Sequence, residues 1–204
     1  MVPSPTRGLT QPERVELSNI RLLQAATELI VEKGWEATTA AEIGRRAGYS
    51  RTMVHARYGS KDAILDAFLH EYVRQLNPDP DPADSGMQQV LAHFDRIQDV
   101  YQQDPTLLRA MFAATFEGAK STSPLRERVR AQLESGAAKV DRGLRAGMKD
   151  GSVRADIDIT AAVNDITASV FGIAFLWVVV QGEHDLEREL ADTRTRIINQ
   201  YGPN

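Results

Sequence analysis

The chain has 204 residues, of which 42% are hydrophobic and 25% charged, and its formal net charge is −4. This composition is typical of a globular protein with one sizeable domain or two smaller ones. The chain contains no cysteine, which excludes disulfides and thiolate metal sites and favours a cytoplasmic location. The strongly apolar stretch 170–180 is about half as long as a membrane span requires, so we predict no membrane partner.

The charges are unevenly distributed along the chain. Residues 1–76 hold ten Lys and Arg against nine Asp and Glu, a net of +1, while the remaining residues hold fourteen against nineteen, a net of −5. Residues 44–61 contain no acidic side chain but five basic ones, namely Arg45, Arg46, Arg51, Arg57 and Lys61. A compact basic cluster on an acidic chain predicts a local anionic partner.

The N-terminal residues predict an arm followed by a helix. Residues 1–10 lack the apolar run of a signal peptide, and we expect a flexible arm over 1–15. Apolar residues recur at helical spacing over 17–33, with Ser18 as the predicted N-cap and Gly34 as the stop.

Glycine and hydroxyl side chains divide the next segment into three helices. Thr39 and Glu42 form a capping-box pattern, and Gly48 and Gly59 interrupt the chain. Such short helices, each restarted by Ser or Thr, predict a compact helical unit. The predicted helices span residues 40–47, 51–58 and 61–76.

The remaining chain also predicts helices, after a clear break. Residues 77–86 contain three prolines and three aspartates, which cannot continue a helix. We find no convincing strand and predict an all-α fold, with an N-terminal domain over 16–76 and a C-terminal helical domain over 77–204. The helices predicted in the second domain span residues 87–103, 106–120, 124–149, 159–181 and 186–201.

Residues 39–58 have the pattern of a helix-turn-helix, which places its second helix in the major groove of DNA. Val54 and Tyr58 share one face of that helix and are expected to pack inward. Ser50 begins the helix, whose first backbone N–H groups suit phosphate. The side chains expected to face outward are Arg51, Thr52, Met53, His55 and Ala56.

Residues 22–65, LLQAATELIVEKGWEATTAAEIGRRAGYSRTMVHARYGSKDAIL, resemble the N-terminal domain of the TetR family of repressors. The resemblance implies that Thr39 and Lys61 contact phosphates and that Arg51, Thr52 and Met53 lie at the groove. His55 stands where the family usually has a phosphate-contacting tyrosine. Of the adjacent Arg45 and Arg46 we expect one near DNA, and assign Arg46. The predicted DNA-binding residues are Thr39, Arg46, Ser50, Arg51, Thr52, Met53, His55 and Lys61.

The resemblance also implies that the C-terminal domain binds a small molecule. Most large apolar residues there are expected to form the core, and a minority to line a cavity. Phe112 and Phe116, four residues apart on one helix, are the leading candidates, and His93 and Arg109 are candidates to orient a polar group. The predicted ligand-binding residues are His93, Tyr101, Arg109, Met111, Phe112, Phe116 and Phe175.

The last two predicted helices favour a homodimer. The first is apolar nearly all round, which indicates burial on most sides, and the second has one apolar face. Pairing with a second copy would present two recognition helices to a near-palindromic site. The predicted interface residues are Ile166, Val170, Ile173, Trp177, Leu190 and Ile197.

These features predict a transcriptional regulator that binds a double-stranded DNA operator and is released by a small-molecule effector, acting as a repressor. An activator would have the same DNA-binding chemistry. A helical interaction module, or a DNA binder without ligand control, remains an alternative. A helical enzyme is a further one, but the sequence has no nucleophile motif, no Glu-x-x-His pair and no phosphate-binding glycine loop, so we predict no enzyme, no cofactor and no metal.

Overall fold

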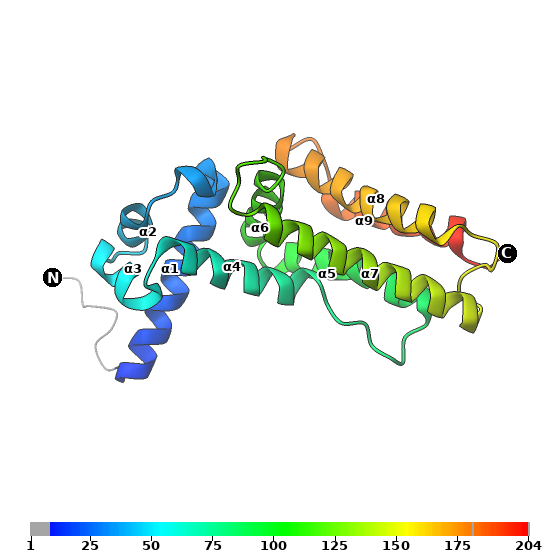
Figure 1. Ribbon diagram of the computed structural model, residues 1–204, viewed down its shortest axis with the longest axis horizontal. Helices are drawn as coiled ribbons and strands as arrows, with labels where there is room; N and C mark the ends of the chain where they lie inside the picture. The colour runs from blue at the N-terminus through cyan, green and yellow to red at the C-terminus, as the bar shows by residue number, and fades with distance from the viewer. Residues whose placement is uncertain (1–8, 181, 204) are drawn as a thin grey trace. The chain divides into compact units, whose positions relative to one another are not determined.

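The computed structural model describes residues 9–180 and 182–203, apart from the side chains of 71–75. This part of the chain forms nine helices and no strand, which confirms the predicted all-α fold (Figure 1). The helices are α1 Gln11–Ala37, α2 Ala40–Arg46, α3 Arg51–Tyr58, α4 Lys61–Leu76, α5 Gly86–Gln103, α6 Pro105–Glu117, α7 Arg126–Asp150, α8 Ile159–Val179 and α9 Leu186–Tyr201.

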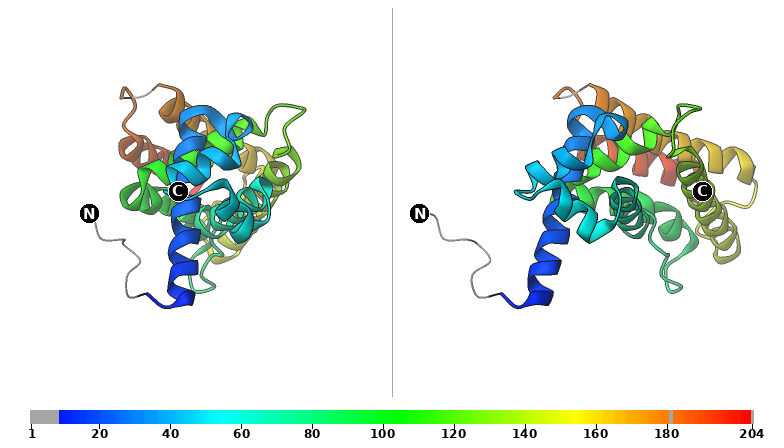
Figure 2. Two further views of the ribbon diagram at one scale, coloured as in Figure 1. Left: turned by 90° about the vertical axis from the view of Figure 1, so that its left-hand side faces the viewer. Right: turned by 60° about the vertical axis from the view of Figure 1, so that its left-hand side comes forward.

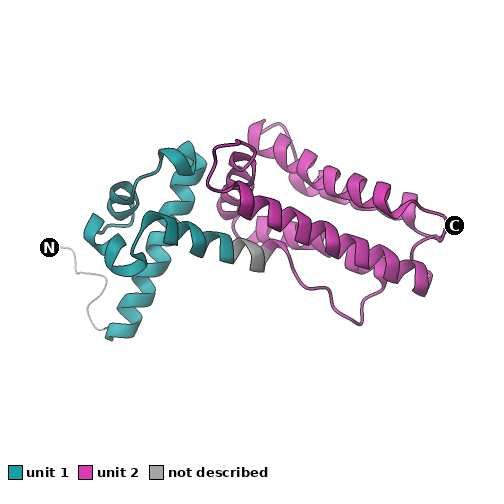
Figure 3. Ribbon diagram, in the orientation of Figure 1, with its two compact units in different colours: residues 1–71 teal, residues 72–204 magenta. Residues whose placement is uncertain are grey.

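The chain divides into two compact units, residues 1–71 and 72–204 (Figure 3). The division lies inside α4, so one continuous helix contributes to both units. The sequence placed the boundary at the end of this helix, where the proline-rich segment 77–86 begins. The units are called unit 1 and unit 2 below.

Helix α1 begins earlier than predicted. Its N-cap is Thr10, which accepts a hydrogen bond from the backbone of Glu13, while the Glu13 carboxylate accepts from the Thr10 backbone in return. The expected arm over 1–15 is therefore too long, and Ser18 is a buried residue within the helix rather than its cap. Gly34, at φ 80°, breaks the helical geometry as predicted.

Unit 1 has a small apolar core made by its four helices. Trp35 follows the break at Gly34 and is fully buried, and Val54 is the buried residue of α3. Because α2 and α3 are short, each contributes a single large anchor to this core. The fully buried side chains of unit 1 include Leu22, Ile30, Trp35, Ile43, Ile64, Leu65 and Phe68.

Unit 2 brings α5 and α7 together through glycines. A Cβ added to Gly86 would lie 1.9 Å from the backbone nitrogen of Gly147, and one added to Gly143 would lie 2.9 Å from a methyl carbon of Val90. Backbones pack this closely only where side chains are absent. The two helices are therefore locked at one end by main-chain contact.

Helices α8 and α9 lie side by side in unit 2 (Figures 1 and 2). Helix α8 has 21 residues and a mean hydropathy of 1.7, so its length and composition would suffice to cross a membrane. The stretch 170–180 used to exclude a membrane span is thus only part of a longer apolar helix. In unit 2 this helix packs against α6, α7 and α9. Its predicted end at Gln181 lies outside the described residues.

Candidate functional site

A tight turn connects α2 and α3. Gly48 has a φ of 77°, and the Tyr49 N–H donates to the Gly44 carbonyl at 2.7 Å. A Cβ on Gly44 would lie 2.8 Å from the Ser50 carbonyl oxygen, so the turn folds directly onto α2. This geometry confirms the helix-turn-helix predicted over 39–58.

Helix α3 turns one face to the core and leaves the opposite face open. Val54 is completely buried, and Ser50 caps the helix by accepting from the Met53 N–H at 3.3 Å. Small side chains at Thr52 and Ala56 allow close approach to a base edge. The exposed residues of α3 are Arg51, Thr52, His55 and Ala56, and Met53 is partly exposed.

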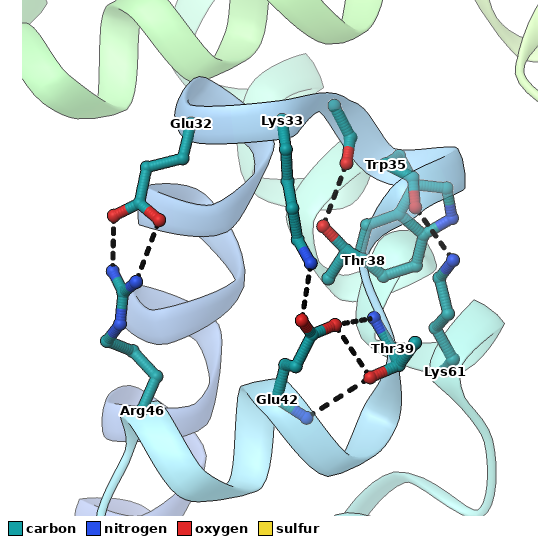
Figure 4. Close-up of polar contacts among 9 residues, drawn as sticks. Glu32, Lys33, Trp35, Thr38, Thr39, Glu42, Arg46 and Lys61 are labelled. Carbon is teal, nitrogen blue, oxygen red and sulfur yellow. Dashed lines mark hydrogen bonds and ion pairs between the residues drawn. The ribbon is translucent and has the colours of Figure 1, made fainter.

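Three of the five cations in the basic cluster have partners within unit 1, and Figure 4 shows Arg46 and Lys61 with theirs. Arg46 pairs with both oxygens of Glu32, at 2.6 and 2.8 Å, and with Glu28 at 3.1 Å. Arg57 donates to the Ser18 hydroxyl at 2.7 Å, so it contacts the first helix. Lys61 donates to the Trp35 carbonyl at 2.7 Å and lies 4.6 Å from the Trp35 ring centroid.

The other two cations, Arg45 and Arg51, are exposed and have no ion pair among the described residues. Their neighbour Arg46 has its charge compensated by two carboxylates, which also raise its pKa above the usual value. Arg45 is therefore the better placed of the adjacent arginines for an anionic partner. The sequence assigned Arg46 because spacing alone does not show which arginine faces α1.

Thr39 and Lys33 hold the Glu42 carboxylate at the start of α2 (Figure 4). Lys33 donates to Glu42 at 2.6 Å, and the Thr39 hydroxyl donates at 2.7 Å. These bonds lower the pKa of Glu42 to about 2, and the bond from Lys33 has the largest effect. The capping box is thus formed as predicted, with the Thr39 hydroxyl bound inside the unit.

The side chain of His55 is oriented by a hydrogen bond to the C-terminal end of α3. Its Nδ1 lies 3.0 Å from the Gly59 carbonyl oxygen, which can only accept, so Nδ1 carries the proton. In the neutral ring Nε2 is then an acceptor, and only the imidazolium form has an Nε2–H to offer a phosphate.

Unit 2 contains a cavity of about 70 Å³. Two of the predicted ligand-binding residues, His93 and Phe112, line it. It lies among the end of α4 and helices α5, α6, α7 and α8. Its lining comprises Leu76, Asn77, His93, Phe94, Ile97, Phe112, Gln132, Leu133, Gly136, Ala137, Val140, Ile166, Thr167, Val170 and Phe171.

The other predicted ligand residues lie elsewhere in unit 2. Met111 is in the core. Tyr101 packs edge-on against Trp177, over which Arg109 stacks at 4.6 Å. Phe116 lines an open groove that neighbours the cavity, and Phe175, 49% exposed, packs edge-on against the Phe116 ring. Helical spacing placed these residues on helices but did not show which faces turn toward the cavity.

Apart from His93, the polar residues of the cavity were missed by the sequence analysis. Asn77 follows the last residue of α4, where the pattern indicated only a loop. Gln132 lies on α7 and Thr167 on α8, and both have polar and apolar neighbours in the sequence, so no pattern distinguishes them. The one signal available was Asn77 itself, a polar residue at the junction of an apolar helix with a proline-rich segment.

The predicted dimer residues need a correction. Ile166, Trp177, Leu190 and Ile197 are at most 6% exposed within a single chain, so they belong to the core of unit 2. Val170 lines the cavity. Ile173 is partly exposed, so of the predicted set it alone stays available to a second copy. The spacing did not separate it from the buried residues because α8 is apolar almost all round. The exposed large apolar side chains of α8 and α9 are Phe175, Leu176, Val179 and Ile198.

Comparison with known proteins agrees with the helix-turn-helix. Residues 22–68 match the family model described as bacterial regulatory proteins, tetR family, and this match covers the first helices and the turn. Together with the geometry of α2 and α3, it identifies a DNA-binding transcriptional regulator. The N-terminal part of this chain is therefore similar to the DNA-binding domain of the TetR family.

Relatives extend the likeness beyond the matched segment. The chain is 26% identical over 161 residues to an uncharacterized HTH-type transcriptional regulator, YdeS, of Bacillus subtilis strain 168, with 78% of each chain covered. Two solved structures share the fold. They are the MbdR regulator from Azoarcus sp. CIB (TM-score 0.74, 19% identity, 89% of this chain and 97% of that one) and the regulator FadR from Bacillus subtilis in complex with stearoyl-CoA (TM-score 0.70, 17% identity, 88% and 97%).

Proposed function

We propose that this regulator is a cytoplasmic homodimeric repressor that reads a near-palindromic operator with α3 and is released by a small molecule bound in unit 2. The observation that carries the DNA part is the division of the basic cluster. Arg46, Arg57 and Lys61 hold unit 1 together, while Arg45 and Arg51 carry uncompensated charge at the helix-turn-helix. Uncompensated cations beside small side chains suit phosphates and base edges.

The cavity supports the effector part of the proposal. Leu76, the last residue of α4, lines it, and the same helix begins at Lys61 in unit 1. An effector that prefers one position of α4 would thereby favour one state of the DNA-binding unit. The structure of FadR with stearoyl-CoA supports the idea that this fold accommodates a small molecule.

The exposed face of α8 supports the homodimer. Gly172, Phe175, Leu176 and Val179 are exposed on this helix, and Ile198 on α9 adds to the apolar surface. Large exposed apolar surfaces mark association sites. A two-fold pair built on this face would present two copies of α3 to DNA.

The operator is tested by selecting bound duplexes from a random DNA pool and titrating the selected sequence at several salt concentrations. We expect a near-palindromic sequence whose affinity falls as salt rises, because phosphate contacts release counterions. Arg51→Ala is expected to weaken binding about tenfold. Arg142→Ala, an exposed arginine of α7, is the matched control and should bind as the wild type does.

Two results would contradict the proposal. Failure to enrich any sequence would remove the operator, and equal losses in the Arg51 and Arg142 variants would show only a general charge effect. An activator would pass the same binding tests, so a reporter gene placed behind the selected operator distinguishes repression from activation.

A further inference from the structure

We infer that the effector of this regulator is an uncharged, largely apolar molecule with a hydrogen-bond donor, and that this donor is received by the side-chain oxygen of Asn77. This inference rests on the proposed function, in which the cavity of unit 2 is the effector site. It adds the chemistry that the cavity selects and the residue that anchors the ligand.

Asn77 is held firmly but incompletely satisfied. It is 7% exposed, its Nδ2 donates to the Ser135 hydroxyl at 3.2 Å, and its backbone oxygen accepts from Lys139 at 2.8 Å. Its Oδ1 is buried and has no hydrogen-bond partner among the described residues. A buried acceptor without a partner is unfavourable, and a ligand that donates to it removes that penalty.

His93 also lines the cavity and provides a second acceptor. Its Nδ1 donates to the Leu76 carbonyl oxygen at 3.3 Å, which leaves Nε2 as the acceptor of the neutral ring. Burial, followed by the nearby charge of Lys139, lowers the pKa of His93 and favours this neutral form. Asn77 and His93 therefore each offer a hydrogen-bond acceptor, which a ligand would match with a donor.

The rest of the cavity disfavours a charged ligand. No Asp, Glu, Lys or Arg occurs among its lining residues as the structure describes them. Lys139 lies close by, but it is bound to Asp79 at 2.9 Å and to the carbonyls of Asn77 and Pro78. A carboxylate or an ammonium group buried here would lack a free counter-charge, which is costly.

The neighbouring groove does not supply that charge to the cavity. It adjoins the cavity through Leu133 and Phe171, which line both. Its arginines, Arg126 and Arg130, line the groove and are not among the lining residues of the cavity. Arg130 lies 3.2 Å from Glu127, and Arg126 donates to the Ala119 carbonyl at 3.1 Å.

Gly136 provides a direct means of filling the cavity. It lines the wall from the middle of α7, and a Cβ added there meets no atom within 4 Å. A larger side chain would project into space that is otherwise open, and the helix would keep its backbone. Gly136→Leu is thus expected to occlude the cavity in a folded chain.

The test uses three single-ring probes of similar size, phenol, toluene and benzoate, titrated against the full chain by calorimetry and followed by NMR. Phenol is an uncharged donor, toluene lacks the donor and benzoate is an anion. We expect phenol to bind about tenfold more tightly than toluene, because one buried hydrogen bond is gained. Benzoate should bind more weakly than either.

Variants locate the donor's partner. Asn77→Leu should abolish the preference for phenol over toluene. Its thermal stability should change little, because removal of the buried unpartnered acceptor offsets the lost hydrogen bond to Ser135. Thr167→Val, which removes another polar group of the lining, should retain that preference. Gly136→Leu should abolish binding of both probes.

Each alternative outcome overturns a different statement. Equal affinity for phenol and toluene, or tighter binding of benzoate, contradicts the uncharged donor. A preference lost in Thr167→Val but kept in Asn77→Leu contradicts the anchor. DNA binding is measured separately on the same samples. If the wild type binds DNA but none of the probes, the inference is contradicted. If the wild type does not bind DNA, the proposed function is contradicted instead.

Discussion

The interactions that stabilise unit 1 internally differ from those that stabilise unit 2. In unit 1 the short helices α2 and α3 each contribute one or two buried residues, and Arg46 and Arg57 bind them to α1 through ion pairs and a hydrogen bond. Lys61 binds the start of α4 to α1 in the same way. In unit 2 longer helices pack through apolar side chains and glycine contacts such as that of Gly86 with Gly147.

This difference shows how function is recognised in each unit. In unit 1, where polar contacts supplement a small apolar core, the informative side chains are cations without an ion-pair partner, here Arg45 and Arg51. Where apolar packing builds the fold, the informative side chain is a polar group without a partner, here Asn77. The side chains without partners therefore suit DNA in unit 1 and a small-molecule ligand in unit 2.

The largest effect is expected at the apolar face that unit 2 leaves open. Leu176→Glu places a charge on this face of α8, where Leu176 is 44% exposed in a single chain. We expect the dimer to dissociate at least a hundredfold more readily, since a buried charge without a partner is costly. Light scattering and sedimentation measure the change. Ala138→Glu, on an exposed position of α7, should remain dimeric; a dimeric Leu176→Glu chain would place the interface elsewhere.

Close backbone packing in unit 2 is the next most sensitive feature. Gly86→Ala forces a Cβ to within 1.9 Å of the Gly147 nitrogen, so α5 and α7 must separate. We expect the free energy of unfolding to fall by about 3 kcal/mol in denaturant titrations. Gly136→Ala is the matched control on α7, and should be neutral or stabilising by up to about 1 kcal/mol. Equal losses in both variants would show that contact with α7 is not the cause.

Adjacent arginines separate binding from folding in unit 1. Arg45→Ala should weaken operator binding about tenfold and leave the melting temperature unchanged, because the side chain has no ion pair among the described residues. Arg46→Ala should lower the melting temperature, since Glu28 and Glu32 lose their partner. Fluorescence anisotropy and thermal denaturation on the same samples measure both effects. The reverse pattern would restore the assignment of Arg46 to DNA.

A small, acid-dependent effect is expected at the cap of α2. The pKa of Glu42 is lowered to about 2 by hydrogen bonds from Lys33 and Thr39, so the carboxylate stabilises the folded state at neutral pH. This contribution is present above the usual pKa of a glutamate and is lost as pH falls from there toward 2. Glu42→Gln should therefore be less stable than the wild type at pH 7, with the difference shrinking in acid. If the difference in stability between Glu42→Gln and the wild type does not depend on pH, the charge of Glu42 does not contribute to the cap.

The sequence predicted the helices well because their signals are local. Caps such as Thr39 and Ser50 and stops such as Gly34 act within a few residues, and the structure confirms them. The orientation of each helix face is not local. Nothing in the spacing of α8 distinguishes the buried Ile166 from the exposed Phe175, because both belong to a helix that is apolar on nearly every side.

The same limit explains the arginines and the cavity. Whether Arg45 or Arg46 faces the carboxylates of α1 depends on how α2 packs, and that depends on the turn at Gly44. Asn77 became informative only when its oxygen was found buried without a partner. Residues whose role depends on partners distant in the sequence require the fold.

The exposed ion pairs of Arg46 have a consequence for any count of phosphate contacts. Dissolved ions screen the attraction of Arg46 to Glu28 and Glu32 just as they screen the attraction of a protein to DNA. Added salt therefore loosens the support of α2 while it weakens the complex. The logarithmic salt slope of operator affinity will combine counterion release with this intramolecular loosening, and will overstate the number of contacted phosphates unless the slope of an Arg46→Ala chain is measured beside it.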